Sequence, residues 1–363
     1  LEFPVGTVLL TAAEAGGLLG CPRFSPLGDL LAVGTSSGYL AVGLEGGRRV
    51  LIEGVPEAGH ATTWSWSPDG REIWFTASDA LESRSLEAVS LSGRRRLLSR
   101  APGALTVYDV SRDGVALLEH AFTRARVMAL APEESREREL SIFDRTYVTD
   151  ISADGQQALL GERGAATGDR TFADLGRLDG SPPMRLAEDG YPSALSPDGR
   201  WALLTPTGLG PEESKWSGLR IVPVGAGEVR TVATGVLQVV TADWVPGSDR
   251  LLVAGREPGR GLQVFLLAPS GERERTLTPE GIEVGQGIPC DGRRIACVAP
   301  DGRVSLYPLD GGPVRELGGL EAGTVPLVFS PNGRALLVRG PRATATAPHL
   351  IYRVDLATGE RTF

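Results

Sequence analysis

The chain has 363 residues, and Gly and Pro together account for 74 of them, 48 and 26 respectively. Both residues disrupt helix interiors, so this share excludes a mainly helical protein. The 41% of hydrophobic residues, gathered in short Val, Leu and Ile runs, excludes a disordered one. The net charge of -8 argues against a nucleic-acid partner, and no apolar stretch approaches the ~20 residues of a membrane span. An all-β chain with many turns remains.

One phrase recurs along the chain: an apolar residue, then Ser-Pro-Asp-Gly or a close variant, then an apolar run. Its eight turn positions are Gly28, Gly70, Gly114, Gly155, Gly199, Ser248, Gly292 and Gly333. The first and last lie 305 residues apart over seven intervals, a mean period of about 44, which matches a four-stranded propeller blade. The sixth copy lacks Asp-Gly, and Cys290 replaces Pro in the seventh.

In chain order, each copy predicts four strands. A first strand ends at the apolar residue, the Pro, Asp and Gly residues form a tight turn, and a second strand returns, as at 71–76 and 334–338. A third strand follows 10–20 residues later, as at 219–224 and 262–267. A turn then leads to a charged fourth strand, whose charges suit a solvated outer edge, at 48–52, 136–140 and 272–277.

Four strands per copy without a crossover helix predict an all-β fold, a β-propeller of four-stranded antiparallel blades over residues 1–363. We expect one eight-bladed ring; seven blades, or parts of two six-bladed rings, are the alternatives. Residues 1–18 carry an expected strand at Thr7–Thr11 of a preceding or closing blade, and a last strand at 360–363 competes for the same place. We therefore expect a fragment of a longer array.

The apolar residues that end the first strands are expected to fill one equivalent position between neighbouring blades. They are Phe24, Trp66, Val110, Ile151, Leu195, Trp244, Ile288 and Phe329. An inner strand is covered on both faces by the adjacent blades, so a large apolar side chain there belongs to the core. A ligand-stacking role for Trp66 or Trp244 is the alternative.

The Ser-Pro-Asp-Gly hairpin with apolar flanks resembles the TolB-type, WD40-like β-propeller repeat over essentially the whole chain. Longer phrases resemble one subgroup, the C-terminal propeller regions of bacterial serine/threonine protein kinases; they lie at 1–6, 66–77, 257–261, 310–312 and 355–359. In that family the kinase domain is N-terminal and the propeller follows, commonly beyond a membrane segment. The resemblance implies a bacterial sensory or interaction module on the extracytoplasmic, periplasmic side, and it carries over no catalytic residue.

A search for catalytic motifs finds none. Lys215, the only lysine, lies in a polar loop, and neither His-Arg-Asp nor Asp-Phe-Gly occurs, so kinase chemistry would lie outside this chain. The string Gly34–Gly38 matches Gly-x-Ser-x-Gly, but no helix follows it, so we interpret it as a turn. Without these motifs we expect a chain that is not an enzyme.

Cysteine and histidine usage predicts neither a disulfide framework nor a metal site. The three cysteines are Cys21, Cys290 and Cys297, and no Cys-x-x-Cys or histidine cluster is present. We expect Cys290 and Cys297 to be buried free thiols, with a bond across a hairpin as the alternative. No cofactor is expected.

The position just before each first-strand apolar residue is polar in several copies. In chain order these residues are Arg23, Ser65, Asp109, Asp150, Ala194, Asp243, Gly287 and Val328. One interpretation is that each Asp caps backbone N–H groups of its own or a neighbouring blade. The other is a polar rim around a central channel, in which Arg23, Asp109, Asp150 and Asp243 bind a cation or a small polar ligand.

One loop residue is a candidate protein contact. Trp216 lies in the insertion 205–218 of the longest interval, where a loop aromatic can anchor a partner or can fold onto its own blade.

These observations together predict a non-catalytic propeller that binds a protein, a peptide or a small polar ligand, as the sensory part of a bacterial serine/threonine kinase. A TolB-like periplasmic scaffold acting alone, and a lyase or glycosidase with its active site in the channel, are the alternatives. A kinase domain and a membrane span immediately upstream in the gene would exclude the stand-alone scaffold.

Overall fold

The computed structural model describes the chain except residues 18, 36–37, 46, 54–63, 81–82, 102, 131–133, 165–166, 168–169, 207–217, 286 and 343–347, and of residues 48–53, 78–80 and 83 it describes the backbone. The chain divides into two compact units. Unit 1 consists of Leu1–Arg124 with Gly164–Asp169, and unit 2 of Ala125–Arg163 with Arg170–Phe363. None of the described residues belongs to a helix of the length and hydrophobicity that crossing a membrane requires.

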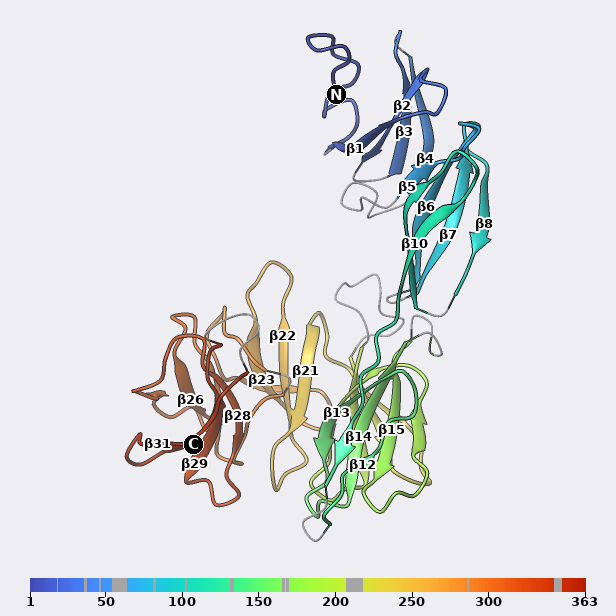
Figure 1. Cartoon of the computed structure of the whole chain (residues 1–363). Helices are drawn as coiled ribbons and strands as arrows, with labels where there is room; N and C mark the ends of the chain where they lie inside the picture. Colours follow the sequence, from blue (N-terminus) through green and yellow to red (C-terminus); the bar gives the residue numbers. More distant parts are fainter. Residues whose placement is uncertain are drawn as a thin grey trace. The chain divides into compact units, whose positions relative to one another are not determined.

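Unit 1 contains the first two repeats and the start of the third (Figure 1). The first sheet has the order β1-β2-β3-β4, and the second joins β5 to β10, with β9 running parallel to β7. The strands are β1 (Leu19–Phe24), β2 (Leu30–Thr35), β3 (Gly38–Gly43), β4 (Arg48–Glu53), β5 (Trp64–Trp66), β6 (Glu72–Ala80), β7 (Ser83–Ser90), β8 (Arg95–Ser99), β9 (Ala104–Val110) and β10 (Ala116–Ala121).

Unit 2 opens with a two-stranded sheet, followed by five sheets of which four have four strands in sequential order. The first strands are β11 (Met128–Ala129), β12 (Arg138–Glu139), β13 (Arg145–Ile151), β14 (Gln157–Arg163), β15 (Phe172–Arg177), β16 (Met184–Ala187), β17 (Tyr191–Leu195), β18 (Trp201–Thr205), β19 (Leu219–Pro223) and β20 (Arg230–Val232). They are followed by β21 (Gln238–Trp244), β22 (Leu251–Arg256), β23 (Gln263–Leu267), β24 (Arg273–Thr276), β25 (Arg294–Val298), β26 (Val304–Pro308), β27 (Arg315–Glu316), β28 (Val325–Phe329), β29 (Ala335–Arg339), β30 (Ile351–Asp355) and β31 (Arg361–Thr362).

The repeat predicted from the sequence therefore corresponds to one antiparallel sheet of sequential strands, as in a propeller blade. The all-β prediction and the four-stranded antiparallel unit are confirmed. The number of blades in a ring stays a prediction.

Two repeats and the N-terminal segment depart from the expected pattern. In the third, β9 and β10 belong to the second sheet, whereas β11 and β12 pair with each other in unit 2. In the seventh, the first strand is reduced to isolated bridges at Glu283 and Cys290, because Gly and Pro in that segment cannot support a regular ladder. At the N-terminus, Thr7–Thr11 does not form the expected strand; Val8 makes one isolated bridge with Glu2.

The turns between first and second strands share one set of hydrogen bonds. In the second repeat, the Ser67 hydroxyl donates to Asp69 Oδ1 (2.7 Å), and the backbone N–H of Arg71 donates to the same oxygen (3.1 Å). The N–H of Glu72 donates to the Ser67 hydroxyl (2.9 Å). The same Ser-to-Asp or Ser-to-Asn bond recurs at Ser111–Asp113, Ser152–Asp154, Ser196–Asp198 and Ser330–Asn332. The recurring phrase thus specifies a closed turn whose polar groups satisfy one another.

A left-handed glycine ends each regular turn, and the sixth turn uses a different geometry. Gly199 has φ 66°, a conformation that costs an L-residue with a side chain roughly 1–2 kcal/mol. In the sixth turn, Ser248 occupies the hydrogen-bonded fourth position, but the positive φ (72°) belongs to Gly247. Pro followed by a positive-φ Gly is the signature of a type II turn, which explains how this copy folds without Asp-Gly.

The hydrophobic core is a series of clusters, each shared by successive sheets. In unit 1, Tyr39 of β3 packs with Trp64 and Phe75 of the second sheet. In unit 2, separate clusters join the β13–β16 sheet to β17–β20, that sheet to β21–β24, and so on to β28–β31. Neighbouring sheets are therefore held face to face by apolar side chains, as expected for adjacent blades.

Most of the predicted first-strand apolar residues are buried. Trp66, Leu195, Trp244, Ile288 and Phe329 are all less than 9% exposed. Phe24 and Ile151 are corrections to that expectation, at 46% and 55% exposed. Each lies in the first four-stranded sheet of its unit, so no four-stranded sheet precedes it there.

Candidate functional site

In unit 1, the structure brings together the candidate residues of three successive repeats. Arg23 on β1 forms an ion pair with Asp109 on β9 (Nη1–Oδ1 3.3 Å) and donates to the Tyr108 carbonyl (3.2 Å). Ser65 on β5 lies between them and donates its hydroxyl hydrogen to Asp109 Oδ1 (2.9 Å). The residues that precede the first-strand apolar position thus form a continuous polar line, which we call the Arg23–Ser65–Asp109 line.

Hydrogen bonding keeps Asp109 ionised. The Ser65 hydroxyl, the Val110 backbone N–H and the Arg23 guanidinium all favour the carboxylate, and together they lower the pKa of Asp109. The side chains remain accessible, at 34% for Arg23 and 69% for Asp109. An ion pair this exposed contributes ~0–1 kcal/mol to stability, so both groups are available for an external ligand at little cost to the fold.

One exposed aromatic side chain lies beside this line. Tyr108, next to Asp109 on β9, is 44% exposed and donates its hydroxyl hydrogen to Glu119 (2.7 Å). Phe24 follows Arg23 on β1, so its side chain lies on the opposite face of the strand, where it packs edge-on against Phe3 with ring centroids 4.9 Å apart. The line therefore presents an aromatic ring and charges of both signs, a composition typical of binding surfaces.

In unit 2, the other two candidates connect neighbouring sheets. Asp150 on β13 accepts N–H bonds from Ile151 of its own strand (2.8 Å) and from Leu195 of the next sheet (2.7 Å). Asp243 on β21 repeats this arrangement, accepting from Trp244 (2.8 Å) and from the backbone of Ile288 in the next sheet. These contacts are the backbone capping that was one of the two predicted interpretations. Ligand binding by either residue stays a prediction.

The surroundings of Asp243 make it a weak acid. Burial, together with the negative charge of Asp150, raises the pKa of Asp243 to about 7. Burial also raises the pKa of Asp150, against the two N–H donors that favour its charge. Two carboxyls in electrostatic contact resist simultaneous ionisation, so this part of unit 2 takes up a proton more readily than ordinary carboxylates do.

The remaining sequence candidates give a mixed picture. Trp216 lies outside the described residues. The three cysteines are free, and burial raises the pKa of Cys290 and of Cys297 to about 12, so both thiols stay protonated and unreactive. Among the described residues, no group of three or more His, Cys, Asp or Glu side chains could hold a metal ion.

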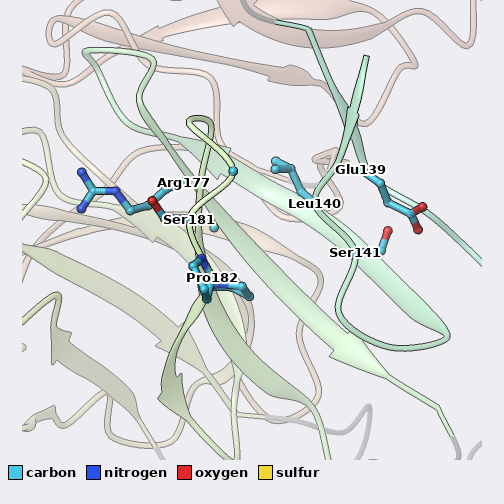
Figure 2. A pocket seen from close by; sticks show the side chains of 9 residues that line it. Glu139, Leu140, Ser141, Arg177, Ser181 and Pro182 are labelled. Carbon is cyan, nitrogen blue, oxygen red and sulfur yellow. The ribbon is translucent and has the colours of Figure 1, made fainter. Parts of the chain in front are cut away.

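Unit 2 contains a small pocket between β12 and the β15–β16 hairpin. Its volume is about 140 Å³, below the ~300 Å³ at which ligand pockets begin. Figure 2 shows Glu139, Leu140 and Ser141 on one side and Arg177, Ser181 and Pro182 on the other. The pocket is too small for a drug-sized ligand, and it marks the edge of a segment that lies over the β13–β16 sheet.

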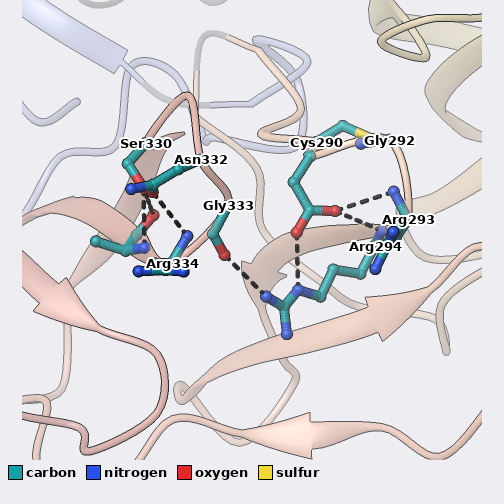
Figure 3. Close-up of polar contacts among 10 residues, drawn as sticks. Cys290, Gly292, Arg293, Arg294, Ser330, Asn332, Gly333 and Arg334 are labelled. Atoms are coloured by element: carbon teal, nitrogen blue, oxygen red, sulfur yellow. Dashed lines mark hydrogen bonds and ion pairs between the residues drawn. The ribbon is translucent and has the colours of Figure 1, made fainter.

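The seventh turn, in which Cys replaces Pro, keeps its shape through a different set of bonds (Figure 3). The Gly292 N–H donates to Cys290 Sγ (3.3 Å), and Asp291 accepts from the Arg294 guanidinium (2.9 Å). Arg294 also donates to the Gly333 carbonyl in the turn of the next repeat (3.2 Å). Arg294 thus links two successive turns.

The sequence analysis missed two buried carboxylates. Glu162 on β14 and Asp174 on β15 are 0% and 2% exposed, although acidic residues are rarely fully buried. Each stands in a strand whose other residues are apolar or Gly except at the strand ends, and this is the sequence signal that could have identified them. Their burial depends on what covers the sheet, and a strand pattern alone does not show that.

Comparison with known proteins assigns no family. No family model matches the chain, and no curated protein matches it. Similar solved structures include a putative TolB from Agrobacterium tumefaciens (16% identity, TM-score 0.34, covering 82% of this chain and 90% of that one). An oligogalacturonate lyase in complex with manganese is 13% identical (TM-score 0.42, 93% and 88%), and a prolyl endopeptidase is 15% identical (TM-score 0.41). The match to the prolyl endopeptidase covers 95% of this chain and 49% of the endopeptidase, so this chain spans about half of that protein's length.

These structures correct one expectation. The chain was expected not to be an enzyme, yet a lyase and an endopeptidase are among the proteins it resembles in structure, so that exclusion is withdrawn. At this level of similarity they assign neither an activity nor a ligand to this chain. The TolB resemblance has a structural counterpart, whereas the resemblance to kinase-associated propellers stays a prediction.

Proposed function

We propose that the chain is a propeller-type binding module and that unit 1 binds a peptide segment of a partner protein along the Arg23–Ser65–Asp109 line. The observation that carries this proposal is the exposed Arg23–Asp109 ion pair, beside which lies the exposed ring of Tyr108. Arg and aromatic side chains dominate the energetics of protein interfaces, and charges of both signs select the register of the bound segment.

The chemistry favours a peptide with both an apolar and a charged side chain. Arg23 and Asp109 neutralise each other, so a ligand that carries only one charge gains little beyond replacing an existing partner. Tyr108 adds apolar contact area beside the pair. A peptide that stacks on this ring and inserts an ion pair of its own satisfies all three groups.

The experiment uses peptides selected on the protein itself, since no ligand is identified. A phage-displayed random peptide library is panned on the full chain, and enriched peptides are synthesised and titrated by isothermal calorimetry. The Arg23→Gln/Asp109→Asn double variant is expected to weaken binding at least tenfold. The matched control is Arg303→Gln, which breaks an exposed ion pair with Glu316 in the seventh repeat and is expected to leave binding unchanged.

Two results would overturn the proposal. One is a library that yields no enriched peptide above background on a chain whose thermal unfolding shows it to be folded. The other is a set of peptides that bind the double variant as tightly as the wild type, because binding would then lie elsewhere on the chain.

We further propose, from the sequence resemblance, that this binding module is the extracytoplasmic sensory region of a bacterial serine/threonine kinase. The gene sequence upstream of the codon for Leu1 tests this directly. A kinase domain followed by a membrane span supports the proposal. Any other upstream arrangement contradicts it and leaves the peptide-binding proposal to its own experiment.

A further inference from the structure

A segment at the start of unit 2 covers one face of the β13–β16 sheet. We call residues 125–130 and 134–143 the cover segment. Its apolar side chains Val127, Ala129 and Leu140 pack against Ala158 and Leu160 of β14. Its backbone is held as well, because the N–H of Ile142 donates to Glu162 Oε1 (3.3 Å) and Phe143 donates its N–H to the same carboxylate.

Glu162 and Asp174 lie on the covered face as diagonal neighbours. Glu162 is opposite Phe172, and Asp174 is opposite Leu160, so the two acids are two residues apart across the β14–β15 pair. Diagonal cross-strand positions are ~7–8 Å apart, within reach of a long side chain. Burial and the charge of Asp174 act on Glu162, whose pKa is raised.

Each carboxylate has one satisfied and one unsatisfied oxygen. Glu162 Oε1 accepts from the Thr146 hydroxyl (2.5 Å) and from Ile142, and Asp174 Oδ1 accepts from Arg185 Nε (2.6 Å). Glu162 Oε2 and Asp174 Oδ2 are buried and have no hydrogen-bond partner among the described residues. A buried unpaired carboxylate oxygen costs several kcal/mol, so a folded protein seldom keeps two of them side by side.

One proton satisfies both oxygens. If Glu162 is protonated at Oε2, this O–H can donate a hydrogen bond to Asp174 Oδ2, and each of the two oxygens then has a hydrogen-bond partner. Burial raises the pKa of Asp174 as well, but the Arg185 guanidinium contacts Asp174 directly and favours its charge, so we assign the proton to Glu162. The pair with Arg185 is then electrically neutral, whereas two ionised carboxylates would leave a net buried charge.

Among the other ionisable groups on the surrounding elements, Arg170 lies toward the covered face, with its guanidinium 5.4 Å from the ring of Phe172, the residue opposite Glu162. Arg170 also forms an exposed ion pair with Glu188. Tyr147 of β13 and Arg163 of β14 are placed with Tyr191 of β17, where the two tyrosine rings stack 5.4 Å apart and the guanidinium lies 5.7 Å from the Tyr191 ring. Successive residues of a strand point to opposite faces, so Tyr147, next to Thr146, belongs to the uncovered face. The cover segment, its connection to β13 and β13 itself contribute Arg126, Glu134, Arg138, Glu139, Asp144 and Arg145.

We propose that Glu162 and Asp174 bind one proton between them at neutral pH, shared by Glu162 Oε2 and Asp174 Oδ2 beneath the cover segment. Loss of the proton leaves two negative charges on the covered face of the β13–β16 sheet, and the protein loses stability as the pH rises.

The sign of the pH dependence follows from the buried acid. A carboxyl whose pKa is raised in the folded state holds a proton that the unfolded chain has released above pH ~4, so its contribution to stability falls as the pH rises toward the folded-state pKa. The folding equilibrium constant is expected to fall by up to tenfold per pH unit for the one proton involved. Glu162→Gln carries an amide that can accept at one end and donate to Asp174 at the other, so it mimics the protonated side chain at every pH.

The experiment combines infrared spectroscopy with denaturation on the full chain. Wild-type protein at pH 7 is expected to show a protonated-carboxyl band that ¹³C-glutamate labelling shifts, in addition to an aspartate-derived band from Asp243 that ¹³C-aspartate labelling shifts. Glu162→Gln is expected to remove the glutamate-derived band and to reduce the loss of stability between pH 5 and 8. Glu188→Gln, at an exposed ion pair with Arg170, is the matched control and is expected to retain both.

Asp174→Asn is expected to destabilise the protein at every pH, because it removes the partner of Arg185. A wild-type spectrum at pH 7 without a glutamate-derived carboxyl band overturns the proposal, and this measurement needs no variant to fold. A Glu162→Gln variant with the wild-type pH dependence of stability overturns it as well.

Discussion

Aspartate serves two opposite purposes at two places in the repeat. Asp198, in a turn, accepts from the Ser196 hydroxyl and from the Arg200 N–H, and these donors lower its pKa. Asp243, at the end of a first strand, also accepts backbone N–H bonds, but burial and the charge of Asp150 outweigh them and raise its pKa to about 7. The exposed turn lets water solvate the charge, whereas the interior position between sheets removes that solvation.

This difference predicts a pH dependence that one substitution abolishes. Asp243 keeps its proton in the folded state up to about pH 7, while an unfolded Asp releases it near pH ~4, so stability contributed by this group falls as the pH rises through that window. Asp243→Asn cannot titrate and is expected to flatten the dependence measured by denaturant unfolding between pH 4.5 and 7.5. Asp113→Asn, at an exposed turn, serves as the control and should keep the wild-type slope. Equal slopes in wild type and Asp243→Asn would show that Asp243 is ionised throughout.

At the scale of elements, the hairpins were predictable and their assembly was not. Each Ser-Pro-Asp-Gly phrase specifies its turn through bonds within five or six residues, so the first and second strands follow from sequence alone. The charged segment at 136–140 has the composition of a fourth strand, yet β12 pairs with β11 in a sheet of its own. The pairing of β12 with β11 depends on contacts with β14, and the burial of Glu162 beneath the cover segment depends on that pairing. Local patterns do not contain this information.

The Arg23–Ser65–Asp109 line of unit 1 was predictable in part. Equivalent positions in successive repeats are brought together by the period, so Arg23 and Asp109 could be paired from their place in the repeat. The exposure of Phe24 was not foreseen, because the sequence gives every first-strand apolar residue the same environment.

The turns themselves are predicted to depend on their left-handed glycine. Gly199 has φ 66° and open space around its α-carbon, so an added Cβ meets no neighbour and the cost of Gly199→Ala is purely conformational. The free energy of unfolding is expected to fall by about 1 kcal/mol. Gly225→Ala is the control, since Gly225 also has open space but no left-handed φ, and it is expected to be neutral or slightly stabilising. Urea denaturation of both variants measures the difference; equal costs would contradict the conformational explanation.

At the scale of the whole molecule, stability is distributed along the chain rather than gathered in one centre. In unit 2, Leu203 of β18 shares a cluster with Trp244, Leu251 and Phe265 of the β21–β24 sheet, and the following cluster begins on the other face of that sheet. Each sheet therefore contacts its sequence neighbours. An array of this kind has a stability that is close to a sum of repeat and nearest-neighbour interface terms.

If stability depends mainly on contacts between neighbouring sheets, a substitution at one interface is expected to destabilise the two sheets that it joins more than the others. Leu203→Ala removes buried methyl groups from the cluster between β17–β20 and β21–β24 and is expected to cost about 2–5 kcal/mol. Hydrogen exchange followed by mass spectrometry is expected to accelerate most in those two sheets. The β28–β31 sheet, which is joined to them only through the seventh repeat, is expected to keep rates close to wild type. A uniform increase across β13–β31 would instead show that unit 2 unfolds as one cooperative body, and the contribution of each sheet could then not be separated from the rest.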